Sequence, residues 1–151
     1  MSIEQAAIDD AQEILALQKL AYTSEAEIYN DFAIPPLHQT LEEIKAEFAD
    51  QRFLKFSEKG RIAGSVRAYV KEGTCYIGKL IVLPECHNQG IGTKLLEEIE
   101  NDFDYVTRYE LFTGHKSEKN LHYYEKNGYR IFRRQKFTDD LTIVFMEKYR
   151  S

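Results

Sequence analysis

The fold of this chain is decided by Lys79-Leu80-Ile81-Val82-Leu83-Pro84-Glu85-Cys86-His87-Asn88-Gln89-Gly90-Ile91-Gly92-Thr93-Lys94-Leu95-Leu96. An apolar strand ends at a proline, a short polar loop follows, and a helix with a leucine face begins at two glycines. The first N–H groups of a helix have no partner within it, and this end of a helix favours phosphate. Because glycine has no side chain, a ligand can approach the backbone closely there. The stretch therefore predicts a site for a phosphorylated cofactor.

Two common phosphate motifs do not match this stretch. A dinucleotide fingerprint needs a third glycine three residues after Gly92, and that position is Leu95. A P-loop needs G-x-x-x-x-G-K-[ST], and the chain contains no such run. Taken alone, the two glycines are equally compatible with an ordinary helix cap.

The composition favours a folded enzyme-sized domain. The chain has 151 residues, of which 43% are hydrophobic, so we expect a single domain spanning residues 1–151. The net charge of -5 argues against a nucleic-acid partner, although it leaves room for a small basic pocket. No apolar run approaches the roughly 20 residues of a membrane span, and the N-terminus lacks a signal core, which predicts a cytoplasmic protein.

The two cysteines indicate neither a metal site nor a disulfide framework. Cys75 and Cys86 form no metal-ligand spacing with histidine. Cys86 lies in the polar loop, where a small buried thiol is the simplest interpretation. We therefore expect no bound metal.

Hydrophobic periodicity predicts an α+β fold with a mixed, mostly antiparallel central sheet flanked by helices. Capping-box patterns at Asp10 with Glu13 and at Thr40 with Glu43 predict the starts of two helices, and 30–36 is predicted as a loop. Glycine-containing turns at Lys59-Gly60 and Glu72-Gly73 separate three strands. The predicted strands are 3–7, 53–58, 62–71, 76–83, 109–113, 129–136 and 141–149, and two later helices are 90–101 and 119–126.

A second motif changes the interpretation of the glycine loop. Asn120-Leu121-His122-Tyr123-Tyr124-Glu125-Lys126-Asn127-Gly128-Tyr129 lies about 30 residues downstream, past one predicted strand. Together the two segments resemble the GCN5-related N-acetyltransferase (GNAT) superfamily, which carries (Gln/Arg)-x-x-Gly-x-(Gly/Ala) and then N-x-x-x-(Y/F)-Y-E-K-x-G-F. The order of elements from Ile3 to Tyr149 is also similar. The run from Val144 to Lys148 is typical of the family's bacterial small-molecule branches.

The resemblance implies acetyl-CoA as the acetyl donor and assigns roles to several residues. The backbone of Leu80, Ile81 and Val82 is expected to bind the pantetheine arm. Asn120 is expected to reach the pantetheine, and Tyr124 to lie near the thioester sulfur as a general acid; alternatively, Tyr124 is an ordinary amphipathic aromatic. Backbone N–H groups are expected to hold the pyrophosphate at His87, Asn88, Gln89, Gly90, Ile91, Gly92 and Thr93.

The sequence departs from the family pattern at two positions. His87 stands where the family usually has Gln or Arg, either as a pH-dependent phosphate contact or as a solvated loop residue. Tyr76 stands where histone-type relatives carry a glutamate base. In place of that glutamate, the general base is a water chain or one of four side chains, Glu25, Glu27, His38 and Glu72. The alternative interpretation of each of these side chains is an ordinary surface group.

In relatives, the first two helices and their loop border the acceptor, which corresponds here to residues 22–41. This segment is acidic and aromatic, which favours a cationic amine, or else it is a solvated loop with packing aromatics. The partner is then a small-molecule or peptide amine, and the C-terminal strands permit a homodimer. The candidate substrate-binding residues are Glu25, Tyr29, Phe32 and Tyr76, in a segment that also contains Glu27 and Asp31.

The leading hypothesis is an acetyl-CoA-dependent N-acetyltransferase in which a primary amine attacks the thioester directly. An acyl-CoA sensor without turnover is the alternative, and a partner-binding protein with a vacant cleft is the third hypothesis.

Overall fold

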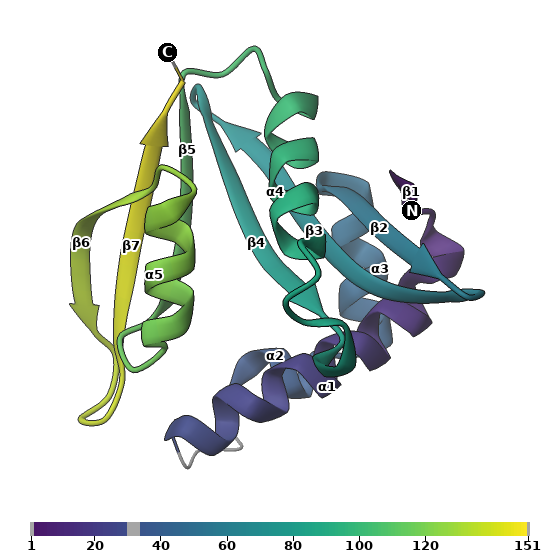
Figure 1. Ribbon diagram of the computed structural model, residues 1–151, viewed down its shortest axis with the longest axis horizontal. Coiled ribbons are helices and arrows are strands. Elements are labelled where there is room, and N and C mark those ends of the chain that lie inside the picture. The colour runs from purple at the N-terminus through teal and green to yellow at the C-terminus, as the bar shows by residue number, and fades with distance from the viewer. Residues whose placement is uncertain (1, 30–33, 151) are drawn as a thin grey trace.

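The structure is a computed structural model that describes residues 2–29 and 34–150, apart from the side chain of Glu25. It has one mixed sheet with helices on its faces (Figure 1), as the sequence predicts. The strands are β1 (Ser2–Gln5), β2 (Arg52–Glu58), β3 (Arg61–Lys71), β4 (Thr74–Val82), β5 (Arg108–Gly114), β6 (Arg130–Lys136) and β7 (Thr142–Tyr149). The helices are α1 (Ala11–Tyr29), α2 (Pro35–His38), α3 (Leu41–Asp50), α4 (Ile91–Asp102) and α5 (Glu118–Lys126), with 3-10 turns at Ile8–Asp10 and Pro84–Cys86.

The sheet has seven strands in the order β1-β2-β3-β4-β5-β7-β6. Neighbouring strands are antiparallel except β4 and β5, which are parallel. The β2–β3 and β3–β4 turns are tight because Lys59, Gly60, Glu72 and Gly73 all have positive φ, as two-residue hairpin turns require. The sequence predicts both turns correctly.

One edge of the sheet bears on the predicted homodimer. β6 forms this edge, and its sequence RIFRRQK carries four basic side chains, at 130, 133, 134 and 136. Positive charge on an edge strand disfavours pairing with another strand. The homodimer therefore stays a prediction, and this edge does not favour it.

Helix α4 packs on one face of the sheet. Its buried residues Ile91, Leu95 and Ile99 recur at helical spacing, as an amphipathic helix requires. At Gly64 on β3, an added Cβ would lie 2.9 Å from Leu95 Cδ1 and 3.1 Å from Ile91 Cγ2. The helix therefore approaches β3 closely because Gly64 has no side chain.

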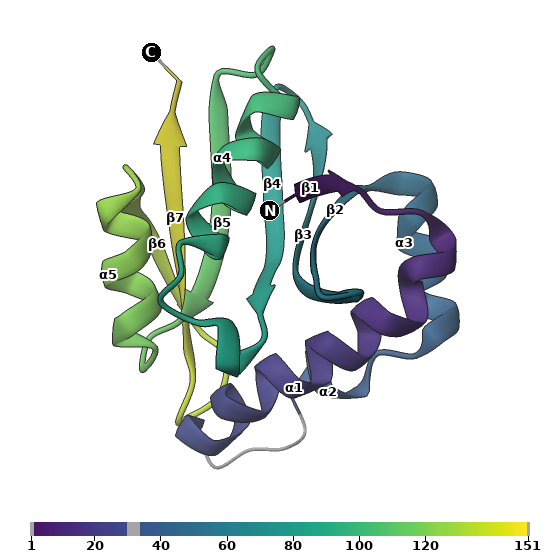
Figure 2. The same ribbon diagram turned by 45° about the vertical axis from the view of Figure 1, so that its right-hand side comes forward.

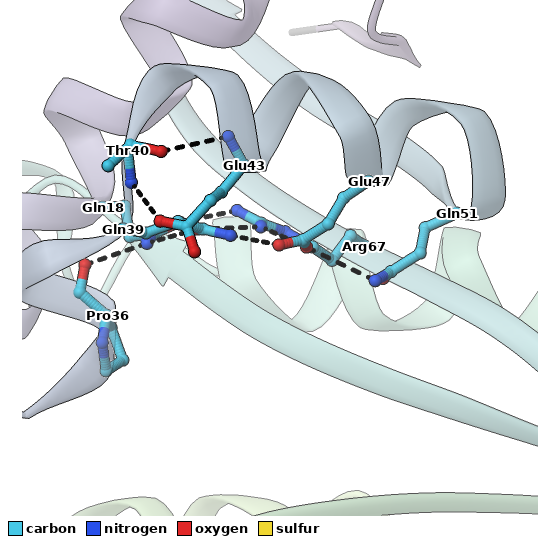
Figure 3. Close-up of polar contacts among 8 residues, drawn as sticks. All are labelled: Gln18, Pro36, Gln39, Thr40, Glu43, Glu47, Gln51 and Arg67. Carbon is cyan, nitrogen blue, oxygen red and sulfur yellow. Dashed lines mark hydrogen bonds and ion pairs between the residues drawn. The ribbon is translucent and has the colours of Figure 1, made fainter.

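Helices α1 and α3 pack on the opposite face, where a polar network joins them to the sheet (Figure 3). Arg67 on β3 is only 1% exposed. Its guanidinium donates to Glu47 Oε1 at 2.8 Å and to Gln18 Oε1 at 2.7 Å. Gln18 in turn donates to Pro36 O and to Gln39 Oε1, both at 2.9 Å. One buried cation thus connects β3, α1, α3 and the segment that carries α2.

Arg67 is not fully satisfied by this network. Its guanidinium carbon also lies over the aromatic ring of Phe53, 4.5 Å from the ring centroid. The Nε atom is buried and has no hydrogen-bond partner among the described residues. Burial lowers the pKa of Arg67, and the hydrogen bond and charge of Glu47 oppose that effect.

The two predicted capping boxes have different outcomes. The Thr40 hydroxyl accepts from Glu43 N–H at 3.1 Å and Glu43 accepts from Thr40 N–H at 2.9 Å, so this box is confirmed. The box at Asp10 and Glu13 is wrong. Asp10 accepts from Ala7 N–H at 2.9 Å, while the Glu13 carboxylate accepts from Ile62 N–H at 2.6 Å on β3. A contact with the sheet thus replaces the local cap.

The loop predicted at 30–36 is only partly described. Residues 30–33 lie outside the described residues, and α2 already begins at Pro35. The proline at the first helical position has no N–H to leave unpaired, which explains why a helix can begin there.

Glu47→Gln is expected to destabilise the protein because Arg67 would keep its buried charge without a counter-ion. The free energy of unfolding should fall by about 2 kcal/mol in urea titration. Glu42→Gln, an exposed change on the same helix, is the matched control and should stay within about 0.5 kcal/mol of the parent. Equal stability of the two variants would show that the Arg67–Glu47 pair is not what holds α3 to the sheet.

Candidate functional site: a fork between two parallel strands

The parallel pairing of β4 and β5 ends early. The ladder joins Thr74 with Arg108, Cys75 with Tyr109 and Tyr76 with Glu110, and then stops. Both strands continue, β4 to Val82 and β5 to Gly114. Figure 1 shows them diverging toward their C-terminal ends. We call this divergence the fork; beyond Tyr76 and Glu110, the edges of β4 and β5 that face each other are no longer paired with one another.

A bulge in β4 accompanies the fork. Arg67 on β3 pairs with Gly78 and Ser65 pairs with Ile81, so Lys79 and Leu80 together stand opposite Val66. Lys79 has φ +48°, which is uncommon for a residue with a side chain. Because a bulge bends the strand that carries it, β4 turns away from β5 just after the last shared ladder pair.

The bulge also fixes which backbone groups of β4 face the fork. Leu83 N–H donates to Ala63 O at 2.8 Å, and Ile81 pairs with Ser65, so these residues direct their backbone toward β3. Backbone direction alternates along a strand, so the backbone of Val82 faces the fork. The Nε2 atom of His87 lies 3.1 Å from Val82 O and must donate, since a carbonyl only accepts.

The loop between β4 and α4 leaves the helix N-terminus uncapped. The N-cap residue Gly90 is left-handed at φ +78°, and no side chain caps the helix. Asn88 is also left-handed, at φ +66°. Because a Cβ at Gly90 would meet nothing within 4 Å, the space beside it is open and glycine is needed for its conformation. The first N–H groups of α4 are available for an anion.

Gly92 has a different reason for being glycine. A Cβ there would lie 3.0 Å from the Tyr123 hydroxyl oxygen of α5. That hydroxyl is 2.9 Å from Thr93 Oγ1. Burial raises the pKa of Tyr123, and the Thr93 hydrogen bond opposes the rise. Close packing of α5 against the N-terminus of α4 therefore explains Gly92, where the sequence suggested close approach of a ligand.

Asn120 and Tyr124 lie four residues apart on α5 and so share a face of that helix. Tyr124 is partly buried, with its ring centroid 5.6 Å from Tyr123 and 6.1 Å from Tyr129 in edge-on geometry. α4 and α5 lie on the same side of the sheet, α4 over β3 and β4 and α5 beside β5 and β7 (Figure 1). Through Tyr123, the structure brings the segment of Asn120 and Tyr124 next to the glycine loop.

The opposite face of the fork carries aromatic and charged side chains. Tyr76 stacks on Tyr69 of β3, with ring centroids 5.3 Å apart and planes 19° apart. Across the ladder, Glu110 pairs with Arg108 at 2.9 Å. Burial raises the pKa of Tyr69, with Tyr76 and Glu110 contributing further. Tyr76, which replaces the expected glutamate, thus lies at the base of the fork.

The other predicted acceptor residues are not brought next to Tyr76. Tyr29 is buried at the C-terminal end of α1, and its hydroxyl accepts from Lys116 N–H at 2.8 Å. Its ring covers Gly114 at the open end of the fork, where a Cβ would clash with it. Tyr29 therefore has a packing role that the sequence did not indicate. Phe32 and Asp31 lie outside the described residues, as does the side chain of Glu25.

The substitute bases with described side chains lie on three different elements. Glu72 is exposed in the β3–β4 turn and Glu27 is exposed on α1. His38 is the last residue of α2. Cys86 is buried 3.6 Å from Glu58 Oε2, and burial and that carboxylate raise the pKa of its thiol. A raised pKa makes Cys86 a poor nucleophile.

The described residues contain neither a metal-ligand cluster nor a membrane-spanning helix. In residues 2–29 and 34–150, no three His, Cys, Asp or Glu side chains lie together as metal ligands would. Among the same residues, no helix has the length and apolarity needed to cross a bilayer.

Sequence reasoning missed Tyr123, Arg67 and Lys79. For Arg67 and Lys79, the sequence did contain a signal: both are charged residues within otherwise apolar strands. Lysine and arginine are rarely buried unless they are paired, so such positions indicate a specific role. Which neighbours they meet depends on strand register, and that appears only in the folded chain.

Comparisons with known proteins agree with this geometry. The sequence model of an acetyltransferase (GNAT) domain matches residues 20–150. The Bacillus subtilis protein named UPF0157 protein YqkA is 28% identical over 119 residues, which are 79% of this chain and 34% of that protein. This chain thus spans about a third of that relative.

Solved structures with a similar fold include two N-acetyltransferases. The PaiA N-acetyltransferase of Thermoplasma acidophilum, solved in complex with coenzyme A, has a TM-score of 0.80 at 18% identity, covering 99% of this chain and all of that one. The ribosomal-protein-S18-alanine N-acetyltransferase of Escherichia coli has a TM-score of 0.77 at 16% identity, covering 98% and 92%. At these identities the likeness concerns the fold.

The contact between Gly92 and Tyr123 predicts energetic coupling between α4 and α5. Gly92→Ala gains helix propensity but pushes on the Tyr123 hydroxyl, so it should destabilise the parent by about 1 kcal/mol. In a Tyr123→Phe background the same change should be neutral or stabilising, a coupling of about 1 kcal/mol in a double-mutant cycle measured by urea titration. Additive effects would mean that the two residues do not press on each other.

Proposed function

Because this chain is a member of the GNAT acetyltransferase family, we propose that it is an acetyl-CoA-dependent N-acetyltransferase acting on a primary amine. The observation that carries the proposal is the fork itself: an unpaired strand edge that ends at an uncapped helix N-terminus. GNAT enzymes use acetyl-CoA, and the related PaiA structure contains coenzyme A.

The residues at the fork fit this donor. The proposed pyrophosphate site is the run of backbone N–H groups from His87 to Thr93, which includes two left-handed positions, Asn88 and Gly90, and the first turn of α4. The N–H of His87 itself already donates to Pro84 O at 3.3 Å, so the donors offered to an anion begin at Asn88. The β4 segment Leu80, Ile81 and Val82 is the proposed contact for the amides of pantetheine, as in strand addition. Within it, the backbone of Val82 faces the fork, whereas that of Ile81 is directed toward β3. His87 holds Val82 O, so the N–H of Val82 is the group left for a ligand.

We assign two catalytic contributions to the chain. When bound, the donor supplies a thioester carbonyl for attack by the amine. Of the two backbone donors expected near the bulge, Leu80 and Ile81, we assign the N–H of Leu80 to stabilise negative charge on that carbonyl oxygen, because the backbone of Ile81 is directed toward β3. Tyr124 gives its phenolic proton to the departing thiolate sulfur, and Asn120 on the same helix face positions the arm.

The acceptor must reach the donor as a neutral amine. An alkylamine has a pKa of about 10, so its proton must leave before attack. Tyr76 stands at the usual base position, and Glu110 is the residue paired with it across the ladder. The acceptor is proposed to be a small-molecule or peptide amine that approaches this base of the fork.

The test of the proposed function is release of free CoA thiol from acetyl-CoA with a panel of amines: polyamines, aminoglycosides, amino acids and peptides. Amine-dependent thiol release with a matching acetylated product is expected. A non-catalytic acyl-CoA sensor would instead be stabilised by CoA, by about 2.7 kcal/mol at 100 times its dissociation constant, with no release. If CoA does not stabilise the protein and no amine causes thiol release, the fork has no CoA ligand and the proposal is contradicted.

Tyr124→Phe is expected to lower kcat by about 100-fold while leaving the acetyl-CoA dissociation constant unchanged, because only the proton donor is lost. Stopped-flow or steady-state thiol detection measures kcat, and calorimetry measures the dissociation constant. Tyr105→Phe, an exposed tyrosine beyond the C-terminal end of α4, is the matched control and should behave like the parent. Unchanged turnover in Tyr124→Phe would remove the general-acid role.

A further inference from the structure

Lys79 occupies an unusual place in the fork. It is the bulge residue of β4, with φ +48°, three residues beyond the last β4–β5 ladder pair. Its side chain is partly buried. A left-handed conformation at a non-glycine residue is a local strain that persists only where the surroundings impose it, and a bulge re-aims the side chain it carries. The bulge therefore sets the direction in which the Lys79 side chain leaves β4, one residue before Leu80.

The face that Lys79 joins follows from its electrostatic neighbours. It interacts with Arg67 and Glu47, which belong to the face covered by α1 and α3. The glycine loop and α4 belong to the other face, where the proposed pyrophosphate site lies. A donor held from the α4 side leaves the α1–α3 side of the fork for the acceptor.

Lys79 is also the unpaired charge of this region. Glu110 pairs with Arg108 at 2.9 Å, and Arg67 pairs with Glu47 at 2.8 Å. Lys79 has neither a hydrogen bond nor an ion pair from its side chain within the part of the chain that the structure describes. Lys71, on the same face of β3, is exposed near the β3–β4 turn and is solvated there.

An unpaired, partly buried ammonium is costly unless a ligand pairs with it. Burial lowers the pKa of Lys79, repulsion from Arg67 lowers it further, and the Glu47 carboxylate acts in the opposite direction. The nearby Arg67 contributes a second positive charge, and its buried Nε has no hydrogen-bond partner among the residues that the structure describes. Two cations and one carboxylate leave an excess positive charge, which favours an anion at this face of the fork.

We propose that Lys79 is the anchor for a carboxylate of the acceptor, and that the acceptor is a small amino acid rather than a carboxylate-free amine. The inference rests on the proposed function. Lys79 directly precedes Leu80, near the proposed point of attack on the thioester. An acceptor that carries its carboxylate and its amine on one carbon, as an α-amino acid does, fits this arrangement. The acceptor then carries both the cationic amine that the sequence predicts and an anionic carboxylate.

Matched acceptors test the anchor in the intact protein: leucine against 3-methylbutylamine, phenylalanine against 2-phenylethylamine, and lysine against cadaverine, each with acetyl-CoA and thiol detection. The parent should prefer one or more of the carboxylate-bearing members by about 10- to 100-fold in kcat/KM, the worth of a charge-assisted hydrogen bond. Lys79→Met should abolish that preference by raising KM for the amino acid while leaving the carboxylate-free amine unaffected.

Two further variants separate anchoring from other roles. Lys79→Arg keeps the positive charge but cannot lose a proton, so it should retain most of the preference, whereas a general base at this position would lose kcat. Lys71→Met removes an exposed lysine from the same face and should behave like the parent. Lys79→Met should melt no lower than the parent, because no native ion pair is broken.

The outcomes distinguish this inference from the proposed function. If amines are acetylated but the parent shows no preference for the carboxylate, or Lys79→Met keeps it, the anchor is wrong and the function stands. If Lys79→Arg loses kcat on both members of a pair, Lys79 serves the chemistry and the anchor is again wrong. If neither member of any pair, nor any other amine, releases thiol, both proposals fail.

Discussion

The site depends on one constraint: β4 and β5 are hydrogen-bonded neighbours for only three residue pairs. The bulge at Lys79 turns β4 just beyond the last pair, so both strands continue without each other. An unpaired parallel edge inside a sheet is uncommon, because buried backbone groups are costly when left without partners. The fork therefore presents unpaired backbone groups to the amide-bearing arm of the proposed donor, and the end of β4 leads through a short loop to the N-terminus of α4.

The two faces of the fork have different chemistry. On one side, α4 and α5 are joined by the contact between Tyr123 and Thr93, which places the segment of Asn120 and Tyr124 beside the glycine loop. On the other side, Arg67 holds α1 and α3 to the sheet through Gln18 and Glu47 (Figure 3). Figure 2, with the right-hand side brought forward, shows α1 crossing the end of the sheet where β4 terminates. These two faces are the ones that our proposals assign to the donor and to the acceptor.

Much of this fold follows from local signals in the sequence. The turns at Lys59-Gly60 and Glu72-Gly73 and the cap at Thr40 are correct because each rests on residues near in sequence. Asp10 and Glu13 failed as a cap because the Glu13 carboxylate meets a strand 49 residues away. The bulge at Lys79 could not be predicted, since it is a matter of register between β3 and β4. The roles proposed for Asn120 and Tyr124 come from the family resemblance, because hydrophobic pattern and spacing do not indicate them.

The most direct measurement is amide hydrogen exchange of the intact protein with and without CoA. If the fork and the helix N-terminus bind the cofactor, exchange should slow at Val82 and at the N–H groups of Gly90, Ile91 and Gly92, while the edge strand β6 stays unchanged. Saturating CoA that stabilises the protein but leaves these amides unprotected, or protects a different surface, would contradict the account.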